Sequence, residues 1–139
     1  MKLPSLNEVE VFVQAPNLED LKILHLSDIH INKKTPLKDI QDLVSLCNLC
    51  EADFIVITGD IIDCKVKYII DKLEVLNSIE KKVFYISGNH DLFYGFDELK
   101  ASLKAFTLLD NETCFLKYKN TKIALAGLSD RFSKFFKIK

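Results

Sequence analysis

Three short motifs rich in Asp, Asn and His combine the residue types and the spacing of a metal site. They are Asp28-Ile29-His30, Gly59-Asp60-Ile61-Ile62-Asp63 and Gly88-Asn89-His90-Asp91. Each motif directly follows an apolar run that predicts a buried strand, at Ile23 to Leu26, Phe54 to Ile57 and Val83 to Ile86. In open α/β sheets, ligands bind in the loops just beyond the carboxyl ends of the strands. We therefore predict one convergent metal site built from the three loops.

The side chains of these motifs suit divalent cations. Hard divalent ions prefer carboxylate and amide oxygens, while imidazole suits Zn, Fe, Mn or Ni. Asp28 and His30 can reach one ion if the backbone bends there, and Asp60 can bridge two ions about 3.5–4 Å apart. Asn89 can donate a neutral oxygen to the second ion. The predicted metal ligands are therefore Asp28, His30, Asp60 and Asn89.

The other polar residues of the motifs are interpreted as catalytic or supporting groups. His90 would lie beside the metals, where it can stabilise charge or protonate a leaving group. We take His90 and Asp91 as the candidate catalytic residues, and expect Asp91 and Asp63 to orient ligands or set a His tautomer from behind them. Gly59 and Gly88 permit the sharp turns that carry a ligand from the strand end into a cleft.

Each motif taken singly has an ordinary structural explanation. A single Asp at a strand end is usually a helix cap, and a single Gly-Asn is usually a turn. His25 lies within the first predicted strand, and we interpret it as a core or sheet-face residue rather than a ligand. For the three motifs together, the structural explanation requires a coincidence at three matching positions, so the metal site is the better hypothesis.

The composition indicates one domain with balanced charge. The chain has 139 residues, 48 % of them hydrophobic, and 19 basic against 20 acidic residues, for a formal net charge of −1. This balance indicates no clear nucleic-acid surface, although it leaves local patches open. There is no apolar stretch near the ~20 residues of a membrane span, and residues 1–5 lack the apolar segment of a secretory signal. We therefore expect a cytoplasmic protein without a transmembrane segment.

Two of the four cysteines, Cys47 and Cys50, form a C-x-x-C motif that can be half of a zinc site or a redox pair. No second C-x-x-C completes a zinc cage. With Leu43 and Leu46, both cysteines continue the apolar face of a predicted helix. The preferred interpretation is that they are free thiols that pack as small hydrophobic residues.

The predicted elements alternate between strands and helices. Period-two alternation over Glu8 to Val13 predicts a half-buried edge strand. Further strands are predicted over 22–27, 54–58 and 83–87. Helices are predicted to begin at Thr35-Pro36 and to cover 65–78 and 96–105. In the helix over 65–78, the residues predicted to face inward are Ile69, Ile70, Leu73 and Leu76. An antiparallel hairpin is predicted from 114–118 and 122–126, with a Phe-rich tail over 132–139. The strand spacing is that of βαβ units, whose parallel strands bring the three motif loops to one edge.

The three motifs together resemble those of the calcineurin-like metallophosphoesterase family. D-x-H, G-D-x-x-D and G-N-H-D follow the family pattern, and Ile23 to His30 is similar to its opening strand; the resemblance covers roughly residues 22–130. It implies an α/β fold, the N-terminal part of a four-layer α/β/β/α sandwich with mainly parallel βαβ units and an antiparallel hairpin. It also implies two divalent metal ions (Mn, Fe, Zn or Mg) and a phosphate-ester substrate.

The resemblance implies that Asp28 and His30 bind the first metal, that Asp60 bridges and Asn89 binds the second, and that His90 acts at the phosphoryl group. The family pattern continues with a Gly-His and a Gly-His-x-His motif, which supply three more ligands. This sequence has three histidines and none after His90. The second metal would keep only Asp60 and Asn89, so we expect it to be held weakly.

We accordingly expect residues 1–139 to form a single, truncated domain. One sheet covered by helices on one side would leave an apolar face open, which predicts self-association or binding of a complementing C-terminal segment. The predicted function is hydrolysis of phosphate mono- or diesters by metal-bound hydroxide, impaired in so short a chain. The alternatives are a non-catalytic metal- or partner-binding fragment and a nuclease-type member of the same family, which the balanced charge disfavours.

Overall fold

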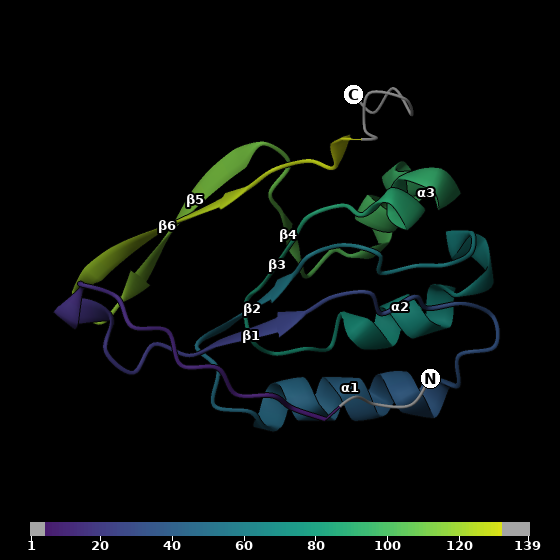
Figure 1. Cartoon of the computed structure of the whole chain (residues 1–139). Helices are drawn as coiled ribbons and strands as arrows, with labels where there is room; N and C mark the ends of the chain where they lie inside the picture. The colour runs from purple at the N-terminus through teal and green to yellow at the C-terminus, as the bar shows by residue number, and fades with distance from the viewer. Residues whose placement is uncertain (1–4, 132–139) are drawn as a thin grey trace.

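A parallel four-stranded sheet is the centre of the fold (Figure 1). The computed structural model describes residues 5–131 of the chain. In spatial order, the strands are β1 (Ile23–Leu26), β2 (Phe54–Ile57), β3 (Val83–Tyr85) and β4 (Thr107–Leu108). All three neighbouring pairs are parallel, with Leu24 opposite Ile55 and Val56 opposite Phe84. The carboxyl ends of β1, β2 and β3 therefore lie at one edge of the sheet, as the sequence predicted.

Helices cover one face of this sheet (Figure 1). They are α1 (Leu37–Leu49), the 3-10 helix η2 (Val66–Tyr68), α2 (Ile70–Leu76) and α3 (Asn89–Ser102), and a short 3-10 helix η1 (Pro16–Leu18) precedes β1. The main core between helices and sheet includes the fully buried Ile40, Ile57, Leu73 and Leu99. Cys47 belongs to this core, and burial raises the pKa of its thiol to about 11. Cys50 packs against the same core, so both residues pack as small hydrophobic side chains, as the sequence predicts.

An antiparallel hairpin packs against part of the other face of the sheet. Its strands are β5 (Glu112–Tyr118) and β6 (Thr121–Gly127), and they confirm the predicted hairpin. A second buried cluster joins hairpin and sheet: Phe54, Phe84 and Leu109, with Leu116 and Leu125 packed against them. The face expected to be open is therefore partly covered, while Ile23 in β1 remains 49 % exposed.

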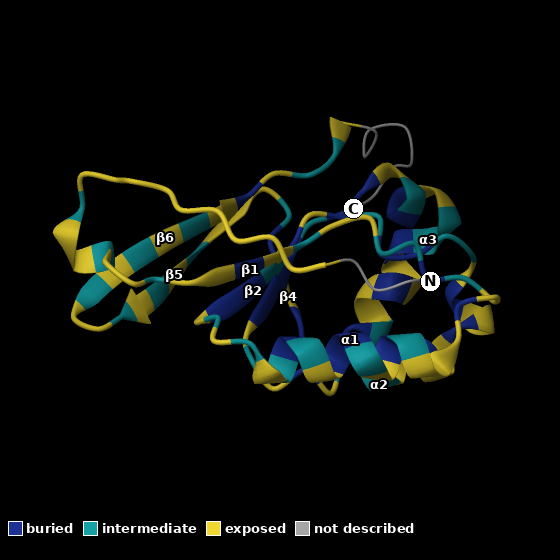
Figure 2. Cartoon of the chain, turned by 60° about the horizontal axis from the view of Figure 1, so that its bottom comes forward, coloured by how far each residue is buried: buried dark blue, intermediate teal, exposed yellow. Residues whose placement is uncertain are grey.

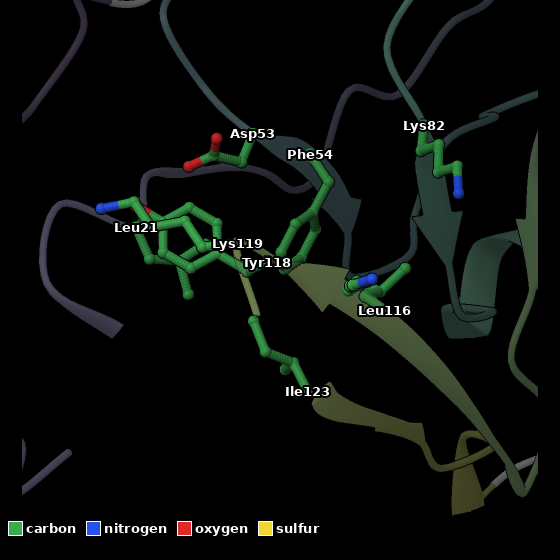
Figure 3. Close-up of a pocket in the computed structure, with 9 residues that line it drawn as sticks. Leu21, Asp53, Phe54, Lys82, Leu116, Tyr118, Lys119 and Ile123 are labelled. Atoms are coloured by element: carbon green, nitrogen blue, oxygen red, sulfur yellow. The ribbon is translucent and has the colours of Figure 1, made fainter. Parts of the chain in front are cut away.

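The hairpin and the sheet leave a groove of about 620 Å³ at the amino end of β2 (Figure 3). Its walls include Phe54 from the sheet and Leu116 and Ile123 from the hairpin. Beside it, the Tyr118 hydroxyl donates a hydrogen bond to the Glu19 carbonyl oxygen at 2.9 Å and ties the hairpin to the segment before β1. Because this groove lies at the amino ends of the strands, it is separate from the three motif loops at their carboxyl ends.

The helices differ from the sequence prediction in two places. The helix predicted over 65–78 is broken at Ile69, between η2 and α2, and Ile70 is 50 % exposed rather than inward. The helix predicted over 96–105 begins earlier, at Asn89, and its backbone is interrupted at Gly95, where φ is 117°. The strand β4 was not predicted, because two residues are too few to give a periodic pattern.

The predicted edge strand over Glu8 to Val13 is wrong. The segment is irregular, and Figure 2 shows the chain leading from the N-terminus as an exposed coil. Val9, Val11 and Phe12 are 81 %, 76 % and 92 % exposed. Alternation supplies the face of a strand but not its hydrogen-bonded neighbour, and no strand within residues 5–131 pairs with this segment. The Phe-rich stretch 132–139 lies outside the described residues.

Replacing the exposed Phe12 by Ser is expected to change the free energy of unfolding by less than about 0.5 kcal/mol, because the ring makes little buried contact. As a matched comparison, Phe96→Ser removes a ring that is only 3 % exposed, and should cost about 3–5 kcal/mol. Urea denaturation followed by circular dichroism measures both values. A loss above about 1 kcal/mol for Phe12→Ser would mean that this segment is packed in solution.

Candidate metal centre

The three motifs converge at the carboxyl ends of β1, β2 and β3. The first two loops run side by side: the backbone N–H of Asp28 donates to the Gly59 carbonyl at 3.2 Å, and that of His30 donates to the Asp60 carbonyl at 2.9 Å. The third loop joins them because the backbone N–H of His90 donates to Asp60 Oδ1 at 3.0 Å. The predicted convergence of the motifs is therefore present in the backbone itself.

The backbone bends at the candidate ligands in a way that few residues tolerate. Asp28, His30 and Asp60 all have left-handed conformations, with φ of 55°, 51° and 53°. Such conformations cost on the order of 1–3 kcal/mol each and cluster at functional sites. Gly59 has φ 89°, and a Cβ there would lie 2.5 Å from the Gly88 nitrogen. Gly88 has an ordinary φ of −104°, and is needed instead because a Cβ would collide with Asp60.

Asp28, His30 and Asp60 form the first group of candidate ligands. One ligand atom from each lies within 4.8 Å of the others. His30 Nε2 is 3.6 Å from Asp28 Oδ1, and the Ser27 hydroxyl donates to Asp28 Oδ2 at 2.7 Å. The hydrogen bond from Ser27 is the main cause that lowers the pKa of Asp28, and burial opposes it. The charge of His30 and hydrogen bonding with Asp60 and His30 lower this pKa further. Asp28 therefore favours the ionised form that accepts a cation.

These residues fit a divalent cation. Two carboxyl groups within 4.8 Å repel each other once both are ionised, and a cation between them reverses that repulsion. The Nδ1 atom of His30 is buried and has no hydrogen-bond partner among the described residues, so this imidazole is not satisfied by the protein alone. Asn89 is exposed at the first residue of α3, next to His90, whose backbone is bonded to Asp60.

His90 and Asp63 form a pair beside this group. His90 Nδ1 lies 2.8 Å from Asp63 Oδ1, and the rings of His30 and His90 meet edge to face with centroids 4.8 Å apart. Because an ionised carboxylate only accepts hydrogen bonds, Asp63 favours the His90 tautomer with the proton on Nδ1. Asp63, His30 and His90 also form a second group with ligand atoms within 4.8 Å, so His30 is common to both groups.

Asp91 lies behind the site and joins two of its loops. Its side chain is fully buried, and Oδ1 accepts hydrogen bonds from the backbone N–H groups of Ile61 and Ile62 at 2.8 and 3.0 Å. Oδ2 accepts from the Gly88 N–H at 2.9 Å, at the start of α3. Burial raises the pKa of Asp91, while these three hydrogen bonds oppose the rise. This position suits a residue that orients the loops and does not itself reach a substrate.

Sequence reasoning missed Lys72, which is 7 % exposed in α2. Its ammonium group donates to the carbonyl oxygens of Asn32 and Lys33 at 3.0 and 3.1 Å, and so holds the chain just after His30. The available signal was a lysine at the inward position of a predicted helix. His25 is exposed on the sheet face, with Nε2 2.7 Å from Thr58 Oγ1, which agrees with its interpretation as a sheet-face residue.

Comparisons with known proteins give the same assignment as the motifs. Residues 21–137 match the family described as calcineurin-like phosphoesterase. An uncharacterized metallophosphoesterase of Campylobacter jejuni is 34 % identical over 136 residues, which cover 94 % of this chain and 35 % of that protein. An uncharacterized metallophosphoesterase of Bacillus subtilis is 34 % identical over 121 residues, with 81 % and 42 % covered.

A transmembrane protein with a metallophosphoesterase domain from Danio rerio is 28 % identical over 137 residues, which cover 91 % of this chain and 31 % of that protein. Within residues 5–131, no helix has the length and apolar character needed to cross a membrane. The chain thus spans roughly a third of the length of the Campylobacter jejuni and Danio rerio relatives.

Proposed function

Because the chain belongs to the calcineurin-like phosphoesterase family, we propose that its three motif loops form a metal-dependent site for the hydrolysis of phosphate esters. The observation that carries this proposal is the convergence of two carboxylates and an imidazole next to an oriented His90–Asp63 pair. The first group suits cation binding, and the pair suits proton transfer. The proposed unit is the whole chain, residues 1–139, acting as one domain.

In this proposal, Asp28, His30 and Asp60 hold one divalent cation, and Asp60 and Asn89 hold a second. When bound, such ions supply Lewis-acid stabilisation of charge on the phosphate and activation of water. The carboxylates are anchored for this task by the left-handed backbone and by Ser27, which fixes Asp28. The donor set of oxygen and nitrogen atoms is compatible with Mn, Fe, Zn or Mg.

His90 is proposed to protonate the leaving oxygen. With its Nδ1 proton held by Asp63, the ring is oriented and its Nε2 atom is available to carry the proton that is transferred. As the bond from phosphorus to the leaving oxygen breaks and water adds to phosphorus, this proton neutralises the leaving alkoxide. The proton that the attacking water loses passes to solvent, from which the His90 ring is protonated again. Asp63 also stabilises the protonated ring, since its carboxylate lies 2.8 Å from Nδ1.

A second candidate function is metal binding without turnover. The small number of metal-donor residues favours this function, because only Asp60 and Asn89 are proposed as ligands of the second ion. The histidines of the sequence are His25, His30 and His90, and none of them is proposed as a ligand of the second ion. Two protein ligands hold an ion weakly. In this case the first ion would bind and the ester would not be hydrolysed.

Replacing Asp60 with Asn tests both candidates. The amide keeps an oxygen to accept the His90 N–H but loses the negative charge, so Mn²⁺ affinity should fall by about tenfold or more. Hydrolysis of bis(p-nitrophenyl) phosphate with Mn²⁺ should fall with it. Calorimetry measures the affinity, and release of p-nitrophenolate measures the rate.

The control is Asp42→Asn, since Asp42 forms an exposed ion pair with Lys38 on α1, away from the motifs. It should leave both values unchanged. Full hydrolysis by Asp60→Asn would contradict the proposed site. A wild-type chain that binds Mn²⁺ and cleaves no ester would favour the second candidate.

A further inference from the structure

Four exposed lysines lie in the two segments that continue from the candidate site, one of them, Lys67, in η2. Lys33 and Lys34 follow His30 by three and four residues, and Lys65 and Lys67 follow Asp63 by two and four residues. We refer to Lys33, Lys34, Lys65 and Lys67 as the lysine cluster. The overall charge balance of the chain conceals it, because its two pairs of lysines are about thirty residues apart in the sequence.

The two segments that carry the lysine cluster run next to each other. Ile31 and Ile62 form a parallel β-bridge, and the Asp63 backbone N–H donates to the Ile31 carbonyl at 2.8 Å. A chain spans at most about 3.6 Å per residue, so the Lys33 Cα lies within about 11 Å of the His30 Cα. The backbone at Lys33 therefore lies near the candidate metal centre, and the bridge keeps the second segment beside it.

One aromatic ring gathers two of these charges from different segments. The ammonium group of Lys33 lies 3.7 Å from the centroid of the Tyr68 ring, and that of Lys67 lies 5.0 Å from it. Tyr68 is 47 % exposed, so this arrangement faces solvent. A cation–π contact holds each ammonium near the ring, but the two like charges repel each other. An anion that contacts both would relieve this repulsion.

Within the described part of the chain, the ion pairs do not join a carboxylate to a lysine of the cluster. There, the lysines that form ion pairs are Lys22 with Glu51 and Lys38 with Asp42. The nearby Lys72 adds a further positive charge, and its hydrogen bonds go to the carbonyl oxygens of residues 32 and 33 rather than to a carboxylate. These bonds also fix the backbone from which the Lys33 side chain extends.

We propose that the lysine cluster selects small phosphate esters that carry a second phosphate group next to the one that is cleaved. This inference rests on the proposed function, because the cleaved phosphate is assigned to the metal centre. Lysine ammonium groups are compact charges with three donors each, which suit a phosphate but not a neutral leaving group. The lysine cluster would thus favour substrates such as sugar or nucleoside polyphosphates over simple aryl esters.

The proposal is tested by calorimetry with the metal-free chain in EDTA at low salt. The experiment compares the affinities of the chain for tripolyphosphate and for orthophosphate. The wild type should bind tripolyphosphate about tenfold more tightly than orthophosphate, and the double variant Lys33→Gln/Lys67→Gln should lose about five- to tenfold of this affinity. Raising NaCl to about 0.5 M should shrink the difference, because salt screens exposed charges.

The matched control is Lys119→Gln. Lys119 also lies over a tyrosine, 5.2 Å from the Tyr118 ring centroid, but in the hairpin turn. An equal loss in this control, or no loss in the double variant, would overturn the proposal. So would an affinity for single-stranded oligonucleotides that keeps rising beyond about four nucleotides, since that would indicate a polymer backbone as the ligand.

The two proposals can fail separately. If the wild type hydrolyses bis(p-nitrophenyl) phosphate but the double variant binds tripolyphosphate normally, the proposed role of the lysine cluster is wrong and the proposed function stands. If the chain prefers tripolyphosphate through the cluster but cleaves no ester, the anion site is supported and the proposed hydrolysis fails. The binding measurement needs neither metal nor turnover, so it remains informative in either case.

Discussion

Replacing Asp91 with Ala is expected to lower the free energy of unfolding by about 3 kcal/mol or more, because it leaves three buried N–H groups without an acceptor. These are the backbone donors of Ile61, Ile62 and Gly88, which the carboxylate binds at 2.8, 3.0 and 2.9 Å. The side chain is fully buried, so water does not readily replace it. Urea denaturation with an unchanged m-value measures the loss.

Two further variants make this prediction specific. Asp91→Asn keeps one oxygen for the Ile61 and Ile62 donors but turns an NH₂ group toward the Gly88 N–H, so a loss of about 1–2 kcal/mol is expected. Asp97→Ala removes an exposed carboxylate from the same helix and should change stability by less than about 0.5 kcal/mol. If Asp91→Ala is no less stable than Asp97→Ala, the carboxylate does not hold the two loops together.

The position of the site could be predicted from the sequence because it depends on short-range patterns. Apolar runs of four residues indicate the strands, and the spacing between these runs indicates parallel βαβ units. The observed register and the backbone bonds from the first loop to the second follow from that topology. Asp63 was expected to orient a ligand or set a His tautomer, and its contact with His90 is of that kind.

The sequence did not reveal features that depend on tertiary contacts. The alternation at Glu8 to Val13 predicts a strand, but pairing requires a neighbour that a local pattern cannot supply. α3 begins seven residues before the start that the apolar pattern predicts, because the polar Asn89 and His90 belong to both the site and the first helical turn. The Asp91 side chain accepts the backbone N–H of Gly88, the N-cap residue of this helix, so one motif serves both the helix and the site.

The backbone conformation of the site also depends on tertiary contacts that a local sequence pattern does not reveal. The side chains of Asp28, His30 and Asp60 identify them as candidate ligands, yet their left-handed backbone conformations are what direct those side chains together. Asp is among the residues that tolerate this region, so its choice at two of the three positions has a conformational reason as well as a chemical one. The buried Lys72 likewise needed the fold, since its partners lie about forty residues away.

Replacing His90 with Ala is expected to lower kcat for Mn²⁺-dependent ester hydrolysis by about 10²–10⁴-fold, the usual contribution of a general acid. The loss should depend on the leaving group. An alkyl ester needs its leaving oxygen protonated far more than a p-nitrophenyl ester, so the alkyl substrate should lose more activity. Mn²⁺ affinity, measured by calorimetry, should change little, because His90 is not among the proposed ligands.

Asp63→Asn separates orientation from proton transfer. The amide is neutral and can present a donor to His90 Nδ1, so the ring loses both its fixed tautomer and the charge that stabilises its protonated form. A smaller loss than that of His90→Ala is expected, with the same dependence on the leaving group. Equal losses for alkyl and p-nitrophenyl esters in both variants would show that the pair does not deliver the proton. The second group of His30, Asp63 and His90 would then be the better candidate for holding a cation, since all three offer a ligand atom within 4.8 Å.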